Sequence, residues 1–184
     1  MAEVSKEIIL AAMQGDESAF GEIVETFQNP VYNMCFRMLY NEGAAEDAAQ
    51  ETFWKAWTNI KTYDINRSFG SWLLSIAAHH CIDLTRKKQV PQVEIDETME
   101  EVLPERTPLP VEEVERQERE ELVQKLLGKL NETDRAAIIM RYWNDMSDRD
   151  IAEALNLTES AVKSRLFRAR KQFAQLWQDA EQEN

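Results

Sequence analysis

The sequence contains few of the features that mark secreted or membrane proteins. Only two cysteines, Cys35 and Cys81, occur in 184 residues, so we expect two buried thiols in a reducing compartment and no disulfide. No apolar run approaches the roughly 18–20 residues of a membrane span. The first residues, MAEVSKEIILAAMQGD, lack the basic start and apolar core of a secretory signal. We therefore expect a soluble, cytoplasmic chain without membrane insertion.

Glycine and proline are also scarce, with five of each. No glycine-rich loop that could cradle a phosphate is present, and no regular alternation of strand type occurs. Helix formers dominate, and an apolar fraction of 43% is enough for real hydrophobic cores. The composition predicts an all-α protein rather than a disordered one.

Acidic residues outnumber basic ones, which gives a net charge of −13. The acidic and basic side chains are unevenly distributed along the chain. Residues 89–121 carry twelve acidic and three basic side chains, whereas residues 122–184 carry ten of each. Four of the five prolines also fall between residues 91 and 110. This pattern predicts an acidic, proline-containing linker over 89–118 between two small helical domains, 1–88 and 119–184.

Apolar residues at helical spacing place the helices within these domains. In the N-terminal domain they predict helices over 5–15, 20–40 with a stop near Pro30, 44–60 and 69–88. After the prolines of the linker they predict helices over 111–130 and 133–143.

Residues 147–171 read as two short helices joined by a tight turn. Ser147 and Asp150 have the spacing of a capping box. Asn156 can adopt the left-handed conformation that ends a helix, and Thr158 can cap the next one. These features predict a helix-turn-helix.

The second of these helices is expected to have one apolar and one basic face. Val162, Leu166 and Ala169 share the inward side, and Arg165 and Arg170 lie at the flanks. A basic face with serines and one aromatic ring suits the DNA major groove. The candidate DNA-binding residues are Ser160, Lys163, Ser164, Arg165, Phe167, Arg168 and Lys171.

Two further groups lie in the N-terminal domain. Asp47, Gln50, Glu51 and Trp54 form one helical stripe, in which an aromatic ring stands among polar groups, as in many protein interfaces. An ordinary solvated acidic face is the alternative.

Downstream, an irregular aromatic segment, residues 61–69, precedes a helix with polar groups on its outer side. Aromatic rings and a basic groove are what hold single-stranded nucleic acid.

The chain resembles bacterial sigma factors of the extracytoplasmic-function (ECF) group over essentially its whole length. AVKSRLFRAR at residues 161–170 is similar to the family's minus-thirty-five reader, and AEDAAQETF at residues 45–53 is similar to its polymerase-docking helix. His79 stands where the family usually has asparagine, and Asn156 replaces the usual turn glycine.

The resemblance implies a non-enzymatic specificity subunit without cofactor, metal or catalytic residues. Its 1–88 domain would be sigma region 2 and its 119–184 domain sigma region 4. The implied partners are the clamp coiled coil of RNA polymerase core, promoter DNA and an anti-sigma factor. Asp47, Gln50, Glu51 and Trp54 would bind core. The implied minus-ten residues are Tyr63, Asn66, Phe69, Trp72, His79, Asp83 and Arg86, and the linker would either thread through polymerase channels or act as a tether.

Two other classes of protein fit parts of the sequence. A stand-alone helix-turn-helix regulator would bind duplex DNA without polymerase, but it leaves the α-helical stripe and the aromatic segment unexplained. A metal hydrolase built on His79 and His80 is disfavoured, because adjacent residues point apart on a helix and cannot ligate one ion together.

Overall fold

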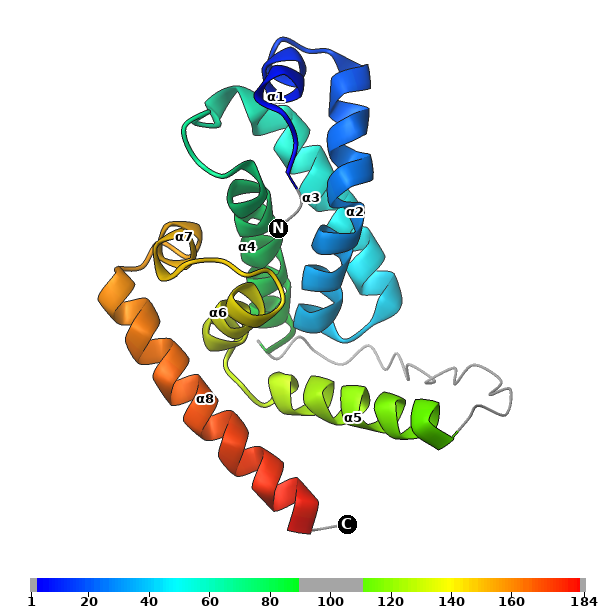
Figure 1. Ribbon diagram of the computed structural model, residues 1–184, viewed down its shortest axis with the longest axis vertical. Helices are drawn as coiled ribbons and strands as arrows, with labels where there is room; N and C mark the ends of the chain where they lie inside the picture. Colours follow the sequence, from blue (N-terminus) through cyan, green and yellow to red (C-terminus); the bar gives the residue numbers. More distant parts are fainter. Residues whose placement is uncertain (1–2, 90–110, 183–184) are drawn as a thin grey trace.

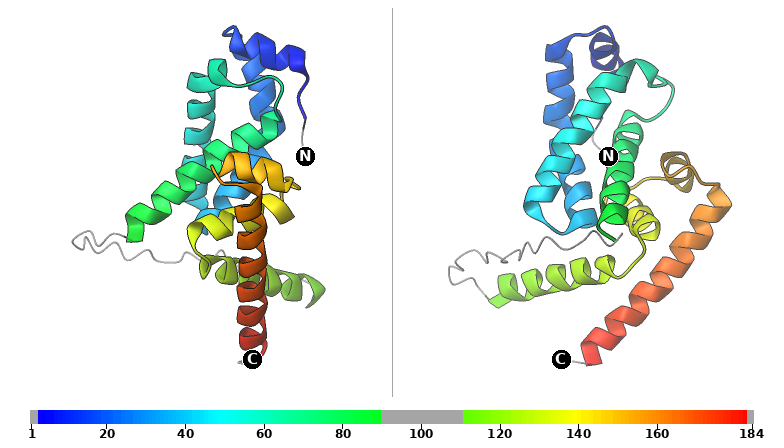
Figure 2. Two further views of the ribbon diagram at one scale, coloured as in Figure 1. Left: turned by 90° about the vertical axis from the view of Figure 1, so that its left-hand side faces the viewer. Right: turned by 180° about the vertical axis from the view of Figure 1, so that it is seen from behind.

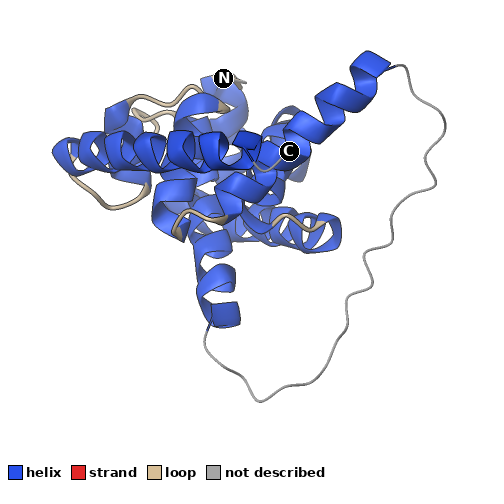
Figure 3. Cartoon of the chain, turned by 90° about the horizontal axis from the view of Figure 1, so that it is seen from below, coloured by secondary structure: helices blue, strands red, loops and turns tan. Residues whose placement is uncertain are grey.

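The computed structural model describes residues 3–89 and 111–182, and every regular element in these residues is a helix (Figure 3). The predicted all-α class is confirmed. The prolines of the predicted linker lie outside the described residues. In chain order the elements are α1 (Lys6–Met13), α2 (Glu17–Leu39), α3 (Glu42–Asn59), a short 3-10 turn η1 (Ile60–Thr62), α4 (Phe69–Gln89), α5 (Val111–Gly128), α6 (Glu132–Tyr142), α7 (Asp148–Ala154) and α8 (Glu159–Gln182).

The N-terminal unit is a bundle of α2, α3 and α4, with α1 packed on α2 (Figure 1). Ile23, Phe27 and Leu73 are among its fully buried side chains. Cys35 and Cys81 are also fully buried and unoxidised, as expected. A hydrogen bond with Cys35, together with burial, raises the pKa of Cys81, so this thiol stays protonated at neutral pH.

Helix α2 continues through Pro30, where the sequence predicted a stop. Proline lacks the N–H that would bond the carbonyl of residue 26, which normally disfavours a helix interior. The side chains on both sides of it, Phe27 and Val31, are fully buried in the same core. Tertiary packing of both halves therefore holds α2 as one 23-residue helix.

The C-terminal unit is formed by α5, α6, α7 and α8. Helix α8 packs along α6 and α7, and the inner end of α5 joins them. Met140, Met146 and Ile151 fill its core with no exposed surface. Helix α5 begins at Val111, as the helical spacing predicted, so residues 111–118, which the charge pattern assigned to the linker, are helical.

The two units pack directly against each other. Helix α4 contacts α6 and α7, and α2 contacts α5 and α6 (Figures 1 and 2). Gln124 of α5 donates hydrogen bonds to the carbonyls of Phe36 and Arg37, at 3.1 and 2.9 Å, and Arg135 of α6 donates one to the carbonyl of Met38, at 2.6 Å. Side chains of the C-terminal unit thus bond carbonyls in the last turn of α2, where a helix terminus leaves carbonyls without intrahelical partners; the Phe36 carbonyl also accepts a bond from the Tyr40 N–H.

Candidate functional site

The helix-turn-helix has the local geometry that the sequence predicted. Ser147 and Asp150 form a reciprocal capping box at the start of α7. Asn156 has φ of +54° in the turn, and the Thr158 hydroxyl accepts a bond from the Ala161 N–H at 3.2 Å. These caps fix the angle at which α8 leaves α7.

The predicted faces of α8 are confirmed. Val162, Leu166 and Ala169 are buried against α6 and α7. Phe167 keeps 63% of its surface exposed. The exposed side also carries Ser160, Lys163, Ser164, Arg168 and Lys171. Helix α8 therefore presents cations, hydroxyls and one aromatic ring on a single outer face.

Arg165 differs from the other candidates on α8. Its Nη1 donates to Oδ1 of the buried Asp134 at 2.8 Å, and only 30% of the arginine side chain is exposed. Asp134 is itself held by Asn131, whose Nδ2 donates to its Oδ2 at 2.6 Å. Arg165 thus ties α8 to the start of α6 instead of projecting from the flank.

The acidic stripe of α3 faces outward at three of its four residues. Asp47 and Gln50 are exposed, and Trp54 is 63% exposed. Glu51 is half-buried and lies 3.6 Å from Lys55, whose Nζ donates to Nδ1 of His80 at 2.9 Å. Burial and the Lys55 charge lower the pKa of His80, which keeps its ring neutral and able to accept that bond.

An apolar hollow of about 400 Å³, which the sequence did not predict, adjoins this stripe. Phe20 and Val24 of α2 face Phe53, Trp54 and Trp57 of α3 across it. The rings of Phe20 and Trp57 are 4.8 Å apart. The aromatic residues beside the polar stripe are visible in the sequence. Recognising that they line a hollow requires knowing that α2 and α3 are neighbours.

The aromatic segment before α4 is more enclosed than expected. Tyr63 and Phe69 are 5% and 6% exposed, and their rings meet edge to face at 5.1 Å. The Tyr63 hydroxyl donates to the carbonyl of Arg67. A base cannot stack on either ring in this conformation, so both residues shape the loop from within. Trp72 is partly exposed and Asn66 is exposed.

The outer side of α4 carries the remaining candidates, His79, Asp83 and Arg86, all exposed. Arg86 Nε lies 2.7 Å from Oε1 of Glu132 in α6. His79 Nε2 and Asn156 Nδ2 are 3.4 Å apart. His79 and His80 therefore contact different partners. Within residues 3–89 and 111–182, histidine, cysteine and carboxylate side chains do not gather in groups of three that could hold a metal ion.

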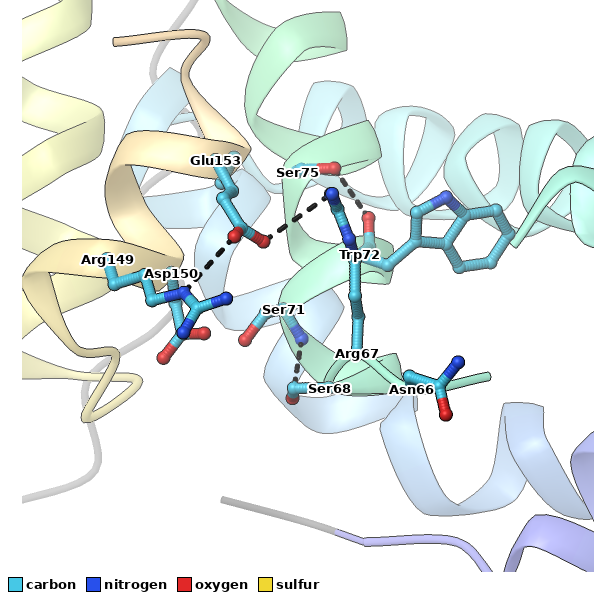
Figure 4. A pocket seen from close by; sticks show the side chains of 10 residues that line it. Asn66, Arg67, Ser68, Ser71, Trp72, Ser75, Arg149, Asp150 and Glu153 are labelled. Carbon is cyan, nitrogen blue, oxygen red and sulfur yellow. Dashed lines mark hydrogen bonds and ion pairs between the residues drawn. The ribbon is translucent and has the colours of Figure 1, made fainter. Parts of the chain in front are cut away.

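A polar pocket of about 320 Å³ lies where this surface meets α7 (Figure 4). One wall comes from the loop and the first turns of α4, including Asn66, Ser71 and Trp72, and the other from Arg149 and Glu153 of α7. The Ser71 hydroxyl is buried there without a hydrogen-bond partner within the protein.

In the part of the chain that the structure describes, no helix combines the length and apolar character that crossing a bilayer requires.

The chain matches two family models and a set of curated proteins. The model "Sigma-70 region 2" matches residues 23–90, and "Sigma-70, region 4" matches residues 120–173. The ECF RNA polymerase sigma factor SigW of Bacillus subtilis is 35% identical over 179 residues, which cover 93% of this chain and 95% of SigW. The ECF RNA polymerase sigma-E factor of Haemophilus influenzae is 30% identical over 180 residues, with 93% and 95% covered.

The fold is similar to solved structures as well. CnrH in complex with the cytosolic domain of CnrY superimposes with a TM-score of 0.72 at 25% identity, covering 95% of this chain and 97% of CnrH. The sigma factor RpoE of Bartonella quintana, solved with the anti-sigma factor NepR, gives a TM-score of 0.66 at 21% identity, which covers 86% of this chain and 96% of RpoE.

Proposed function

Because the chain belongs to the extracytoplasmic-function sigma factors of the sigma-70 family, we propose that its two helical units divide promoter recognition between them. It acts as a sigma factor in transcription initiation by RNA polymerase. The N-terminal unit is proposed to be region 2, which docks on core polymerase and engages the minus-ten element. The C-terminal unit is proposed to be region 4, which reads the minus-thirty-five element.

The exposed face of α8 is the observation that carries the DNA-binding part of the proposal. Lys163, Ser164, Phe167 and Arg168 project from one side of a capped, well-packed helix. Lysine, arginine and serine can bond guanine edges or phosphates, and an apolar ring can contact a thymine methyl. We assign Arg165 a different role, which is to hold α8 in place through Asp134.

The surface of α3 supports the docking assignment. Trp54 stands between the exposed Asp47–Gln50 stripe and the apolar hollow, so an aromatic anchor lies beside both polar and apolar contact area. Such an arrangement is typical of interface hot spots. We propose that the clamp coiled coil of core polymerase binds here.

For the minus-ten element we propose a surface made by Asn66, Trp72, His79, Asp83 and Arg86. These residues keep exposed surface along one side of the loop and α4. Tyr63 and Phe69 support that surface from beneath, since both rings are buried.

Membership of the sigma factor family also supports proposals about a regulatory partner and about the cellular compartment. The sigma factor RpoE of Bartonella quintana was solved with the anti-sigma factor NepR, and we propose that an anti-sigma protein likewise holds this chain. We further propose that it works in the cytoplasm, as a specificity subunit without enzymatic chemistry of its own.

In vitro transcription tests the whole assignment. Purified chain added to core polymerase on fragments of the host genome should produce transcripts whose mapped starts share two upstream elements. A chain that binds duplex DNA but yields no start site with core would instead be a stand-alone helix-turn-helix regulator.

A matched pair of variants tests the docking surface. Asp47→Ala with Gln50→Ala should abolish co-purification with core and leave the thermal unfolding temperature unchanged, because both side chains are exposed. Glu25→Ala with Gln28→Ala removes the same two chemical groups at the same spacing from the exposed side of α2. Equal core binding by both variants would refute the docking assignment.

A further inference from the structure

Three side chains link the acidic stripe of α3 to the neighbouring helix α4. Glu51, one of the four residues of the stripe, has its Oε1 3.6 Å from the Nζ of Lys55. The same Nζ lies 2.9 Å from Nδ1 of His80, which is half-buried on α4. Lys55 therefore stands between two acceptors, and it lies closer to the ring nitrogen than to the carboxylate.

The bond between Lys55 and His80 requires a neutral imidazole ring. A lysine ammonium has three donors and no acceptor, so the ring must accept at Nδ1 and carry its proton on Nε2. Burial, and then the charge of Lys55, lower the pKa of His80; Lys87 acts in the same direction, whereas Glu51 and Asp83 raise it. These charged groups come from both helices that flank the ring. Their combined effect keeps His80 neutral at neutral pH.

The place of Lys55 decides how much negative charge the stripe presents. A direct hydrogen bond between an ammonium and a carboxylate measures about 2.7–2.9 Å, so Glu51 is only loosely paired, and 44% of its side chain is exposed. A protonated His80 could not accept a bond, and it would repel the ammonium beside it. Lys55 would then move onto Glu51 and neutralise it.

From these contacts we infer that His80 is a positioning residue of the docking surface, which holds Lys55 away from Glu51 so that the stripe presents two carboxylates to a basic partner surface. The second carboxylate is that of Asp47, which is exposed. An acidic stripe attracts a basic surface, and an ammonium displaced onto the stripe weakens that attraction. His80 has this role only if the stripe docks on core polymerase, so the inference rests on the proposed function.

The same contacts make docking depend on pH. Above its pKa, His80 is neutral and holds Lys55, and the affinity for core is complete. As the pH falls through the pKa of His80, the ring becomes a cation, releases Lys55 to Glu51 and adds a positive charge beside the stripe. The affinity should therefore fall below about pH 6.5, because the pKa of His80 lies below that ordinary value.

The first test measures the binding of full-length variants to core polymerase at about pH 7.5. His80→Leu removes the acceptor and should weaken binding about two- to fivefold, as expected for one partly exposed charge interaction. His80→Asn keeps an acceptor oxygen near the position of Nδ1 and should bind as the wild type does. Equal binding by both variants would overturn the inference.

A lysine variant separates positioning from a general loss of structure. Lys55→Met removes the ammonium, so that His80 has nothing to hold and Glu51 can no longer be neutralised. Adding His80→Leu to Lys55→Met should therefore not weaken binding further, although any cost of His80→Leu to the fold remains. If the loss caused by His80→Leu persisted in this background, His80 would act on the fold alone and the inference would be wrong.

The pH profile of core binding is a readout that a purely structural role would leave unchanged. Relative to Lys55→Met at each pH, the wild type should lose affinity below about pH 6.5, whereas His80→Asn should run parallel to Lys55→Met. Lys6→Met makes the same chemical change on the exposed side of α1 and should keep the wild-type profile. Parallel profiles for the wild type and Lys55→Met would contradict the inference.

NMR of nitrogen-labelled histidine in the free chain tests the bond itself. The His80 ring should carry its proton on Nε2 and leave Nδ1 unprotonated, and Lys55→Met should shift the Nδ1 signal. A proton on Nδ1 of His80 in the wild type at about pH 7.5 would overturn the inference, because that nitrogen could not accept from Lys55.

The variant Asp47→Ala with Gln50→Ala separates this inference from the proposed function. If that variant binds core as tightly as the wild type, the docking surface is wrong and the role of His80 is refuted with it. If it loses core binding while His80→Leu binds normally and the pH profile of the wild type follows that of Lys55→Met, the docking surface stands and only the role of His80 is refuted.

Discussion

At the scale of single residues, helix α8 carries side chains proposed to contact DNA only a few positions from side chains that hold the helix in place. Arg165 and Arg168 are three positions apart, yet the first is paired with the buried Asp134 and the second is exposed. The apolar side chains inward of them fix which arginine faces which way. Charge count alone therefore says little about which cations of α8 reach DNA.

Replacing these two arginines one at a time should separate stability from DNA binding. Arg165→Ala removes the cation paired with the buried Asp134 carboxylate and leaves Asn131 as its side-chain donor, which should lower the free energy of unfolding by about 1–2 kcal/mol. Arg168→Ala should change it by less than about 0.5 kcal/mol while weakening use of the minus-thirty-five element. Denaturant unfolding and promoter transcription of both variants provide the comparison; equal stability losses would contradict the assignment.

Phe167 should affect specificity without affecting the fold. Its ring is 63% exposed on the outer face of α8, so Phe167→Ala removes little packing within the protein. Loss of an apolar contact in the groove should lower transcription from a promoter that depends on the minus-thirty-five element by about tenfold, which lies within the usual range for a specific base contact. Lack of any effect on such a promoter, with Lys163→Ala as the positive control, would show that the reading face lies elsewhere.

Sequence reasoning succeeded on α8 because helical periodicity alone decides its inner and outer faces. It could not find the partner of Arg165, because Asp134 is 31 residues away and the pairing depends on how α6 crosses α8. The burial of the aromatic segment, residues 61–69, could not be predicted for a related reason. An irregular segment has no period, so nothing in the sequence showed that the rings of Tyr63 and Phe69 are buried.

At the scale of elements, most helix ends were predictable and one internal feature was not. The capping box at Ser147 and the left-handed Asn156 are local signals, and the structure confirms both. The break expected at Pro30 was overridden by burial of Phe27 and Val31. Long-range packing decided the outcome there.

Pro30→Ala should therefore stabilise the protein. Alanine restores the N–H that can bond the carbonyl of residue 26, and it favours a helix interior by up to about 3 kcal/mol relative to proline. We expect a gain of about 1–2 kcal/mol in the free energy of unfolding, since part of that preference is lost through the larger entropy of the unfolded chain. Thermal and urea unfolding of the variant measure it. A lower unfolding temperature would mean that α2 needs a bend at this position.

At the scale of the whole molecule, the division into two helical units was predictable but their contact was not. Charge segregation and proline content marked a linker, and neither carries information about whether the units it joins associate. The contacts that join them, such as Gln124 with the carbonyls of Phe36 and Arg37, involve polar groups that look ordinary in the sequence.

The packing predicts that the two units unfold together. Gln124 is 4% exposed and bonds two carbonyls of α2, so Gln124→Ala should remove both of these bonds, leave the Phe36 carbonyl with only the Tyr40 N–H as a partner, and cost about 1–3 kcal/mol. Scanning calorimetry of the wild type should show one transition, and the variant should show a broader or split one. Two separate transitions in the wild type would contradict coupling, and Lys125→Ala, at an exposed neighbouring position, serves as the control.

The unbroken helix α2 has a mechanical consequence. Its first turns border the apolar hollow at Phe20 and Val24, and its last carbonyls are held by Gln124 and Arg135. At 1.5 Å per residue the helix is a rod roughly 34 Å long. Rotating such a rod by about 5° around its first turn swings the far end by about 3 Å, as much as the full length of the bonds that hold it. One unbroken helix therefore connects the apolar hollow to the carbonyls at which the C-terminal unit is attached.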